Sequence, residues 1–191
     1  YDGTPSQQRV LRELGLRGSI ELDEDDARFW RELYDEKITR ADARFADFLS
    51  ALKELRLDER TVFILASDHG EEDYEHGKFD HGHTLYDELE RVLLAVVSPG
   101  IKGGQVINAQ VGTLNMLPTI LGLVGVPLDS KLGAQIKGKS LVPLLEGRQT
   151  SGEDVYMETD YRLYTRKRGL RTLDGWKLID TLDTGKVELY N

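Results

Sequence analysis

The sequence predicts an α/β fold with a mostly parallel sheet flanked by helices, followed by a small C-terminal antiparallel sheet. Two continuous apolar runs, residues 61–66 and 92–97, have the composition of strands buried on both faces. A long segment before them repeats apolar residues at helical spacing. After residue 152, short alternating runs are separated by turn residues, which is typical of antiparallel hairpins.

The N-terminal helix is predicted over residues 23–55. Asp23 and Asp26 place a capping carboxylate and negative charge where a helix begins. Apolar residues then recur at spacings of mostly three and four: Phe29, Leu33, Ile38, Ala41, Phe45, Phe48, Leu52 and Leu55. At about 1.5 Å per residue this helix would span about 50 Å, a length at which a break can occur.

The two apolar runs are predicted to be parallel neighbours. Residues 84–91, which lie between them, have the pattern of a short helix, and the order strand, helix, strand is typical of a parallel sheet. Residues 111–124 are a further helix candidate. Pro118 stands near its start, where proline fits a first turn or a kink, and Gly125 ends it.

The C-terminal region predicts a separate small sheet. Its strand candidates are residues 155–159, 168–173, 176–182 and 187–190. Asp174-Gly175 stands between two of them, and Asp-Gly between alternating runs is a strong hairpin signal. We therefore expect a main α/β region over residues 1–150 and an incomplete antiparallel subdomain over residues 151–191.

Composition excludes several classes of protein. Lys and Arg total 25 and Asp and Glu total 34, and the resulting net charge of −9 argues against a nucleic-acid binder, which needs a basic face. No apolar run reaches the roughly 18–20 residues of a membrane helix, so no membrane span is expected in this segment. The absence of Cys excludes disulfides and thiolate metal sites within the chain. Because it opens at Tyr1 without Met or a signal peptide, we expect a piece of a longer protein.

A candidate site follows the first apolar run. Several acidic residues lie within a 15-residue segment there. The same segment holds all four histidines of the chain: His69, His76, His81 and His83. Ligands of open α/β sheets collect beyond the carboxyl ends of strands. Asp68 and His69 are adjacent at this strand end, and Gly70 lets the chain turn so that both can face one ion. The carboxylate suits Ca²⁺ or Mg²⁺, and the imidazole suits Mn²⁺ or Zn²⁺.

Each of these features also has a structural interpretation. A lone Asp-His pair at a strand end is more often a cap or a satisfied turn histidine, but the clustering favours a metal or catalytic site. The acidic neighbours are expected to form a solvated loop face: Glu71, Glu72, Asp73 and Glu75. The basic run at residues 166–168 is expected to be a solvated turn, with contact to an anionic substrate as the alternative.

Several short motifs stand in a fixed order along the chain. They are Ser67-Asp-His-Gly-Glu71, Glu75-His-Gly77, His81-Gly-His83, Leu85-Tyr-Asp-Glu88 with Arg91-Val92, and Leu117-Pro-Thr-Ile120. This set resembles the sulfatases of the alkaline phosphatase superfamily. The resemblance covers nearly all of the chain from Tyr34 onward and implies the C-terminal portion of an alkaline phosphatase-like fold.

What the resemblance implies is a divalent-metal hydrolase with an anionic sulfate ester as substrate. In such enzymes the ion is held by two acidic residues near the N-terminus and by a later adjacent pair, which Asp68 and His69 match. Ca²⁺ is favoured over Mg²⁺, Mn²⁺ or Zn²⁺. The nucleophile is a formylglycine made from Cys or Ser in a C/S-x-P-x-R motif. Since this chain has no such motif, we expect it in the missing N-terminal half of the protein.

A basic residue shortly before the tyrosine matched by Tyr86 contacts the sulfate or the leaving oxygen in this family. His83 occupies that kind of place, and His81 is the second candidate; a protonated imidazole there can donate to the departing alkoxide. The piece alone is expected to be inactive. A phosphodiesterase or phosphonate hydrolase of the same superfamily, and a non-catalytic sulfatase-fold binding protein, remain alternatives. The family expectation for localisation is periplasmic or secreted.

Overall fold

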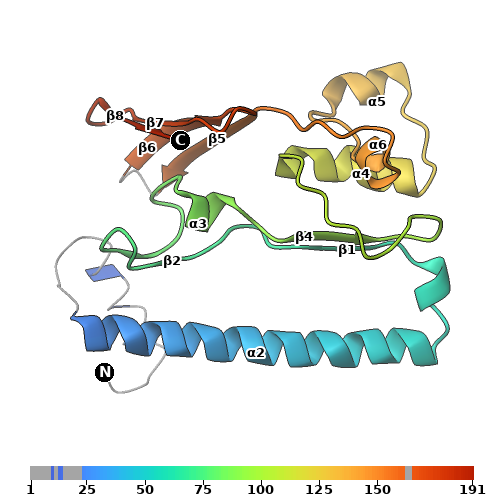
Figure 1. Ribbon diagram of the computed structural model, residues 1–191, viewed down its shortest axis with the longest axis horizontal. Coiled ribbons are helices and arrows are strands. Elements are labelled where there is room, and N and C mark those ends of the chain that lie inside the picture. The colour runs from blue at the N-terminus through green and yellow to red at the C-terminus, as the bar shows by residue number, and fades with distance from the viewer. Residues whose placement is uncertain (1–9, 11–12, 15–22, 162–164) are drawn as a thin grey trace. The chain divides into compact units, whose positions relative to one another are not determined.

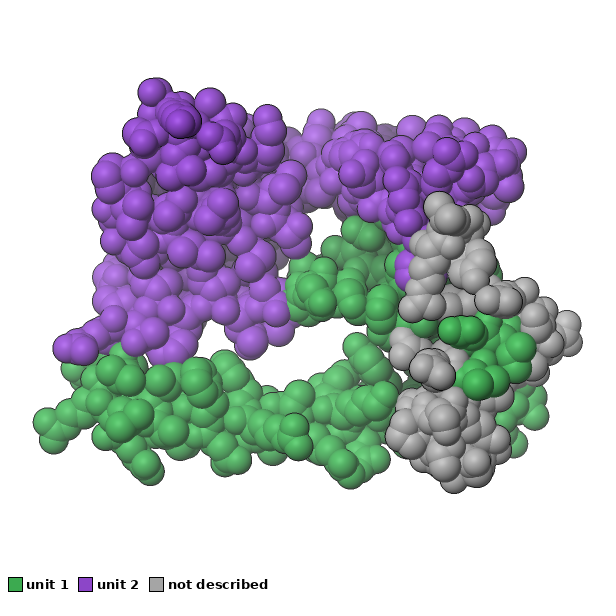
Figure 2. All heavy atoms as spheres, turned by 180° about the vertical axis from the view of Figure 1, so that it is seen from behind, with its two compact units in different colours: residues 1–59, 67–92 green, residues 60–66, 93–191 purple. Residues whose placement is uncertain are grey.

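A computed structural model describes residue 10, residues 13–14, residues 23–161 and residues 165–191. The chain divides into two compact units, residues 1–59 with 67–92 and residues 60–66 with 93–191 (Figure 2). The division expected at residue 150 stays a prediction. None of the described helices is both long enough and apolar enough to cross a membrane.

The first unit contains the long helix α2, Glu24–Glu54, which is unbroken over 31 residues (Figure 1). The predicted cap is confirmed. The Asp23 carboxylate accepts a hydrogen bond from the Asp26 backbone N–H at 2.9 Å, and the Asp26 carboxylate accepts one from the Asp23 backbone N–H at 3.4 Å. This capping box satisfies backbone donors that the start of a helix leaves without partners.

A small hairpin and a one-turn helix belong to the same unit. They are β2 (Glu72–Asp73), β3 (Phe79–Asp80) and α3 (Asp87–Glu90). The two strands are antiparallel, with Glu72 opposite Asp80. The Arg31 guanidinium lies 3.3 Å from the Asp73 carboxylate, so an ion pair joins α2 to the hairpin. Helix α3 is shorter than the helix predicted over residues 84–91.

The second unit contains strands β1, Phe63–Ala66, and β4, Leu94–Val97, within the two predicted apolar runs. They pair antiparallel, with Phe63 opposite Val97, so the predicted parallel arrangement of this pair is wrong. A parallel pair needs a crossover, usually a helix. The segment between these strands instead holds the small hairpin and the single turn of α3. Leu65 and Val97 are exposed in this chain, so the strands are not buried on both faces.

Several short helices follow along the chain: η1 (Asp58–Arg60), η2 (Thr113–Asn115), α4 (Met116–Leu123), α5 (Ser130–Gln135) and α6 (Val142–Leu145). The helix predicted over residues 111–124 is confirmed as η2 followed by α4, with Pro118 in the first turn of α4. Asn115 is 1% exposed. Its amide donates to the Lys139 carbonyl at 2.9 Å and the Glu153 carboxylate at 2.7 Å, and its oxygen accepts from Gly112 N–H at 2.7 Å.

The predicted C-terminal antiparallel sheet is confirmed. Its strands pair in sequence order: β5 (Val155–Tyr161), β6 (Thr165–Arg171), β7 (Lys177–Thr181) and β8 (Lys186–Tyr190). Gly175, at φ 97°, adopts the left-handed conformation in the turn between β6 and β7, which explains the glycine of the Asp-Gly signal. Met157 and Ile179 are buried and form part of the core of this unit.

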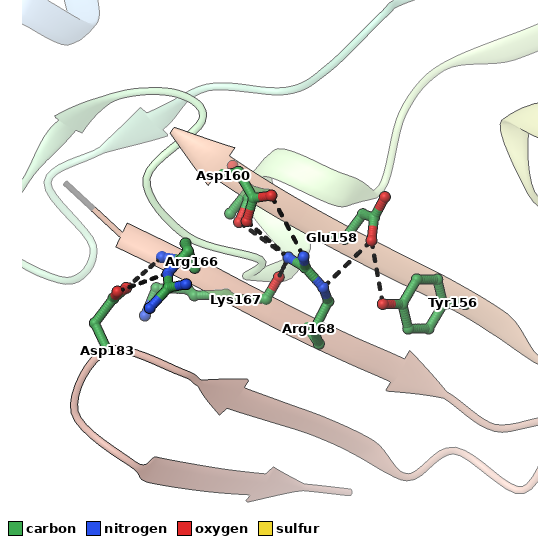
Figure 3. Close-up of polar contacts among 8 residues, drawn as sticks. Tyr156, Glu158, Asp160, Arg166, Lys167, Arg168 and Asp183 are labelled. Carbon is green, nitrogen blue, oxygen red and sulfur yellow. Dashed lines mark hydrogen bonds and ion pairs between the residues drawn. The ribbon is translucent and has the colours of Figure 1, made fainter. Parts of the chain in front are cut away.

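The basic run at residues 166–168 lies within β6, so the predicted solvated turn is wrong. The Arg168 guanidinium lies 2.9 Å from the Asp160 carboxylate, and that of Arg166 lies 2.9 Å from Asp183 (Figure 3). A hydrogen bond from Arg168 holds the pKa of Asp160 below its ordinary range. A hydrogen bond from Arg166 lowers the pKa of Asp183 in the same way. Because cross-strand ion pairs stabilise a sheet, basic residues can follow one another along this strand.

Candidate functional site

Asp68 and His69 lie in the loop that directly follows β1. The Asp68 Oδ1 atom accepts a hydrogen bond from the His69 backbone N–H at 3.1 Å, and Asp68 Oδ2 lies 3.7 Å from His69 Nε2. The other ring nitrogen, His69 Nδ1, is 2.7 Å from the Gly70 carbonyl oxygen. Since a carbonyl only accepts hydrogen bonds, Nδ1 carries the hydrogen of this contact, and Nε2, the ring nitrogen nearer to the Asp68 carboxylate, is the atom left for a cation.

These two donor atoms fit a divalent cation. An oxygen and a nitrogen separated by 3.7 Å can both lie about 2.0–2.6 Å from one ion. The Asp68 side chain is 90% exposed and that of His69 is 41% exposed, which leaves room for further ligands. A carboxylate beside an imidazole suits both hard cations and zinc-like cations, so the donor set fits a divalent metal without selecting one.

Gly70 allows this loop to approach α3 closely. Its backbone N–H donates to the Leu89 carbonyl at 2.7 Å. A Cβ atom at Gly70 would stand 1.8 Å from the Glu88 carbonyl oxygen, far closer than atoms can approach. The glycine is therefore required here by the neighbouring backbone, and its contact with α3 fixes the position of the loop within the first unit.

His81 lies against His69. The two imidazole rings stack with their centroids 3.8 Å apart and an angle of 28° between their planes. His81 Nδ1 is 3.1 Å from the Glu71 carboxylate and 3.0 Å from that of Asp80. Glu71 is only 24% exposed, so the prediction that it belongs to a solvated loop face is wrong. The hairpin directs its carboxylate toward His81 instead.

His83 forms a second histidine–carboxylate pair, which is buried. His83 Nε2 lies 2.8 Å from Glu72 Oε2, and the two side chains are 8% and 1% exposed. The other oxygen of Glu72 accepts a hydrogen bond from the His76 backbone N–H at 3.2 Å. Glu72 is thus also not a solvated loop residue, because β2 turns its side chain inward. His83 Nδ1 and Thr84 Oγ1 are buried without a hydrogen-bond partner in the described part of the chain.

His76 contacts Tyr86 and Glu88. Its ring stacks on Tyr86 with centroids 3.8 Å apart, and Nδ1 lies 2.8 Å from Glu88 Oε1. These contacts tie the hairpin to the start of α3. The structure therefore brings the predicted residues Asp68, His69 and His81 together and places His83 in a separate, buried pair.

The surroundings of the site are acidic. The pKa of Asp73 is raised, first by burial, and the nearby carboxylates of Glu75, Asp35 and Glu71 raise it further, whereas Arg31 lowers it. The pKa of Tyr34, on α2, is also raised by burial and by Glu71 and Asp73. Like charges so close together favour a bound cation and disfavour an anion unless a cation accompanies it.

A family model described as Sulfatase matches residues 21–126, more than half of the chain. The chain belongs to the sulfatase family. The matched region of this sulfatase chain includes the loop with Asp68 and His69 and the hairpin with His81 and His83. The resemblance seen in the sequence motifs is thus confirmed.

Curated relatives of the sulfatase chain are sulfatases too. Arylsulfatase K of Homo sapiens is 34% identical over 114 residues, which cover 60% of this chain and 20% of the relative. The endo-4-O-sulfatase of Bacteroides thetaiotaomicron is 32% identical over 138 residues, which cover 72% of this chain and 27% of the relative. The matched regions are therefore about a fifth to a quarter of the relatives' own lengths.

Solved structures share the fold of the sulfatase chain. A protein solved in complex with its substrate D-glucosamine-2-N,6-O-disulfate matches with a TM-score of 0.68 at 28% identity, over 81% of this chain and 32% of that one. The phosphonate monoester hydrolase of Silicibacter pomeroyi matches with a TM-score of 0.77 at 22% identity, over 90% of this chain and 36% of that one. The second likeness shows the fold alone. Together they support the alkaline phosphatase-like part of the predicted fold class, whereas the strand pairs of the described residues are antiparallel.

Proposed function

We propose that the chain forms part of a metal-dependent sulfatase that hydrolyses sulfate esters. The observation that carries the proposal is the pair formed by Asp68 Oδ2 and His69 Nε2, 3.7 Å apart, in a chain of the sulfatase family. Two acidic ligands and a formylglycine nucleophile would come from an N-terminal half of the same protein. That half would also complete the mostly parallel sheet.

Asp68 and His69 would hold the ion, with Ca²⁺ favoured by the family over Mg²⁺, Mn²⁺ or Zn²⁺. When bound, the ion supplies positive charge that polarises the sulfate oxygens. The acidic surroundings support this part of the proposal, because an anionic ester would otherwise be repelled by Glu71 and Asp73. The relative solved with a disulfated glucosamine favours a sulfated sugar as the class of substrate.

His81 and His83 are the two residues proposed to act on the leaving group. The bond between sulfur and the ester oxygen breaks, and its electron pair stays on that oxygen. A proton from a ring nitrogen of the protonated, positively charged imidazole joins that oxygen and the alcohol leaves, while the ring keeps the electron pair of the former N–H bond and becomes neutral. Sulfur's new bond comes from a nucleophile outside this chain.

A phosphodiesterase or phosphonate hydrolase is the second candidate. The structural likeness to a phosphonate monoester hydrolase favours it, because one scaffold can act on both kinds of ester. The family match and the curated relatives favour the sulfate ester. A sulfatase-fold protein that binds without turnover is the third possibility, and the same assay separates all three.

The test uses the intact protein with aryl sulfate, phosphodiester and phosphonate monoester substrates. We expect metal-dependent turnover of the sulfate above the other two, and we expect Asp68→Ala to abolish both this turnover and tight Ca²⁺ binding measured by calorimetry. Asp47→Ala, which removes an exposed carboxylate of α2, is the matched control and should change neither. Unchanged turnover of an aryl sulfate by Asp68→Ala would remove Asp68 from the site.

A further inference from the structure

Two carboxylates converge on one nitrogen of His81. Glu71 Oε2 lies 3.1 Å and Asp80 Oδ1 lies 3.0 Å from His81 Nδ1. An ionised carboxylate can only accept hydrogen bonds, so the hydrogen of this contact belongs to Nδ1. The ring is therefore oriented by its Nδ1 side, and Nε2 is the nitrogen left for another partner. The His81 side chain is 34% exposed, so a partner can reach the ring.

A metal site made of three side chains is an alternative for His81. One ligand atom each from His69, Glu71 and His81 lies within 4.8 Å of the others, close enough to share an ion. The stacking of the two rings argues against it. The lone pair of an imidazole nitrogen lies in the ring plane, and the planes of His69 and His81 are only 28° from parallel with centroids 3.8 Å apart. Lone pairs of stacked rings do not converge on one ion. His81 is thus a neighbour of the proposed ligand His69.

Asp80 holds its carboxylate at this place through an uncommon backbone conformation. Its φ is 87°, in the left-handed region that residues other than glycine seldom adopt, and it is 7% exposed. Gly82 follows at φ 84°. Strain of this kind persists only where the surrounding structure enforces it, and it concentrates at functional sites. The backbone conformation of Asp80 therefore helps to place its carboxylate beside His81 Nδ1.

We propose that Glu71 and Asp80 are positioning residues that hold His81 with Nε2 toward the sulfate ester. This inference rests on the proposed function and narrows it, because it selects His81 over His83 as the histidine that meets the leaving oxygen. His81 stacks on the proposed ligand His69, whereas the ring of His83 is 8% exposed and paired with Glu72.

The experiment measures kcat and KM of the intact protein for aryl sulfates with good and poor leaving groups. Glu71→Gln keeps the size of the side chain, and Asp80→Asn keeps a residue type that tolerates positive φ. We expect each to lower kcat for the poor leaving group by about 10- to 100-fold, the loss usual for a partner that orients a functional histidine, with a smaller loss for the good one. KM and Ca²⁺ affinity should stay near those of the unaltered protein. In a His81→Ala background, Glu71→Gln should have no further effect.

Two further variants serve as controls. Glu75→Gln changes another carboxylate of the same hairpin, which accepts a hydrogen bond from the Asp73 backbone N–H, and should leave the leaving-group dependence unchanged. Glu72→Gln disturbs the buried His83 pair and should lower the melting temperature while slowing good and poor leaving groups by equal factors.

Three results would overturn the inference. Loss of Ca²⁺ affinity in Glu71→Gln, as large as in Asp68→Ala, would make Glu71 a metal ligand. Equal slowing of good and poor leaving groups by Glu71→Gln would leave it a structural residue. A stronger leaving-group dependence in Glu72→Gln than in Glu71→Gln would assign the role to His83. Absence of sulfate ester hydrolysis in the unaltered protein is a different failure, since it refutes the proposed function itself and the inference with it.

Discussion

Replacing Gly70 with alanine tests how the loop of Asp68 and His69 is held. The new Cβ would lie 1.8 Å from the Glu88 carbonyl oxygen, whereas ordinary contact begins at 3.4 Å, so the two backbones must separate by 3.4 − 1.8 = 1.6 Å. That movement breaks the hydrogen bond from Gly70 N–H to the Leu89 carbonyl, now 2.7 Å long. Overpacking costs about 1–3 kcal/mol and the hydrogen bond about 1 kcal/mol, so we expect a destabilisation of about 2–4 kcal/mol.

The assay is denaturant unfolding of the intact protein, with limited proteolysis to locate the loss of structure to residues 67–92. Two glycines provide matched controls. Gly77 has a φ of 77° but open space around its missing side chain, so Gly77→Ala should cost about 1 kcal/mol. Gly103 has open space and no positive φ, so Gly103→Ala should stay within about 0.5 kcal/mol of the unaltered protein. If Gly70→Ala were as mild as Gly103→Ala, the close approach to α3 would be refuted.

The second unit offers two further predictions. Asn115→Ala leaves buried polar groups without partners and should destabilise the intact protein by about 2–4 kcal/mol in the same unfolding assay, whereas the exposed Asn108→Ala should be neutral. The pKa of Asp183 is lowered by Arg166, so its contribution to stability is present above the unfolded value of about 3.9 and is lost as the pH falls through the folded value. Asp183→Asn should therefore lower the melting temperature at neutral pH but not in acid, and an equal loss at both would contradict the pairing.

Local signals were sufficient for much of the fold. Helix α2 begins at the capping aspartate and follows the apolar repeat, because capping and periodicity act within a few residues of one another. The C-terminal hairpin turn at Asp174-Gly175 is likewise specified by the conformation that its glycine alone adopts readily.

The direction of β4 against β1 was not predictable in the same way. Both strands are apolar, and an apolar run is compatible with a parallel or an antiparallel partner. The path of the connecting segment decides it. The sequence between them is compatible with a crossover helix, but only one turn of helix, α3, forms in it.

The candidate site was predictable as a cluster but not as a set of pairs. The four histidines and the strand end identify the loop and hairpin that carry Asp68, His69 and His81. The carboxylate partners were missed because the hairpin that supplies them has strands of only two residues, too short for any alternating pattern. The one signal in the sequence for these carboxylate–histidine pairs was that residues 71–72 and 80–81 stand on either side of a turn.

The hairpin explains why two adjacent glutamates, Glu71 and Glu72, contact different histidines. Successive side chains of an extended strand point to opposite sides. Glu71, immediately before β2, is 24% exposed and contacts His81, whereas Glu72, in β2, is 1% exposed and contacts His83. The register that sets Glu72 opposite Asp80 therefore sends one carboxylate toward the proposed metal pair and the other into the interior. A shift of this register by one residue would exchange the two environments. The short hairpin thus decides which histidine lies beside His69. For this reason the roles proposed for His81 and His83 rest on their carboxylate partners and not on their spacing to Tyr86.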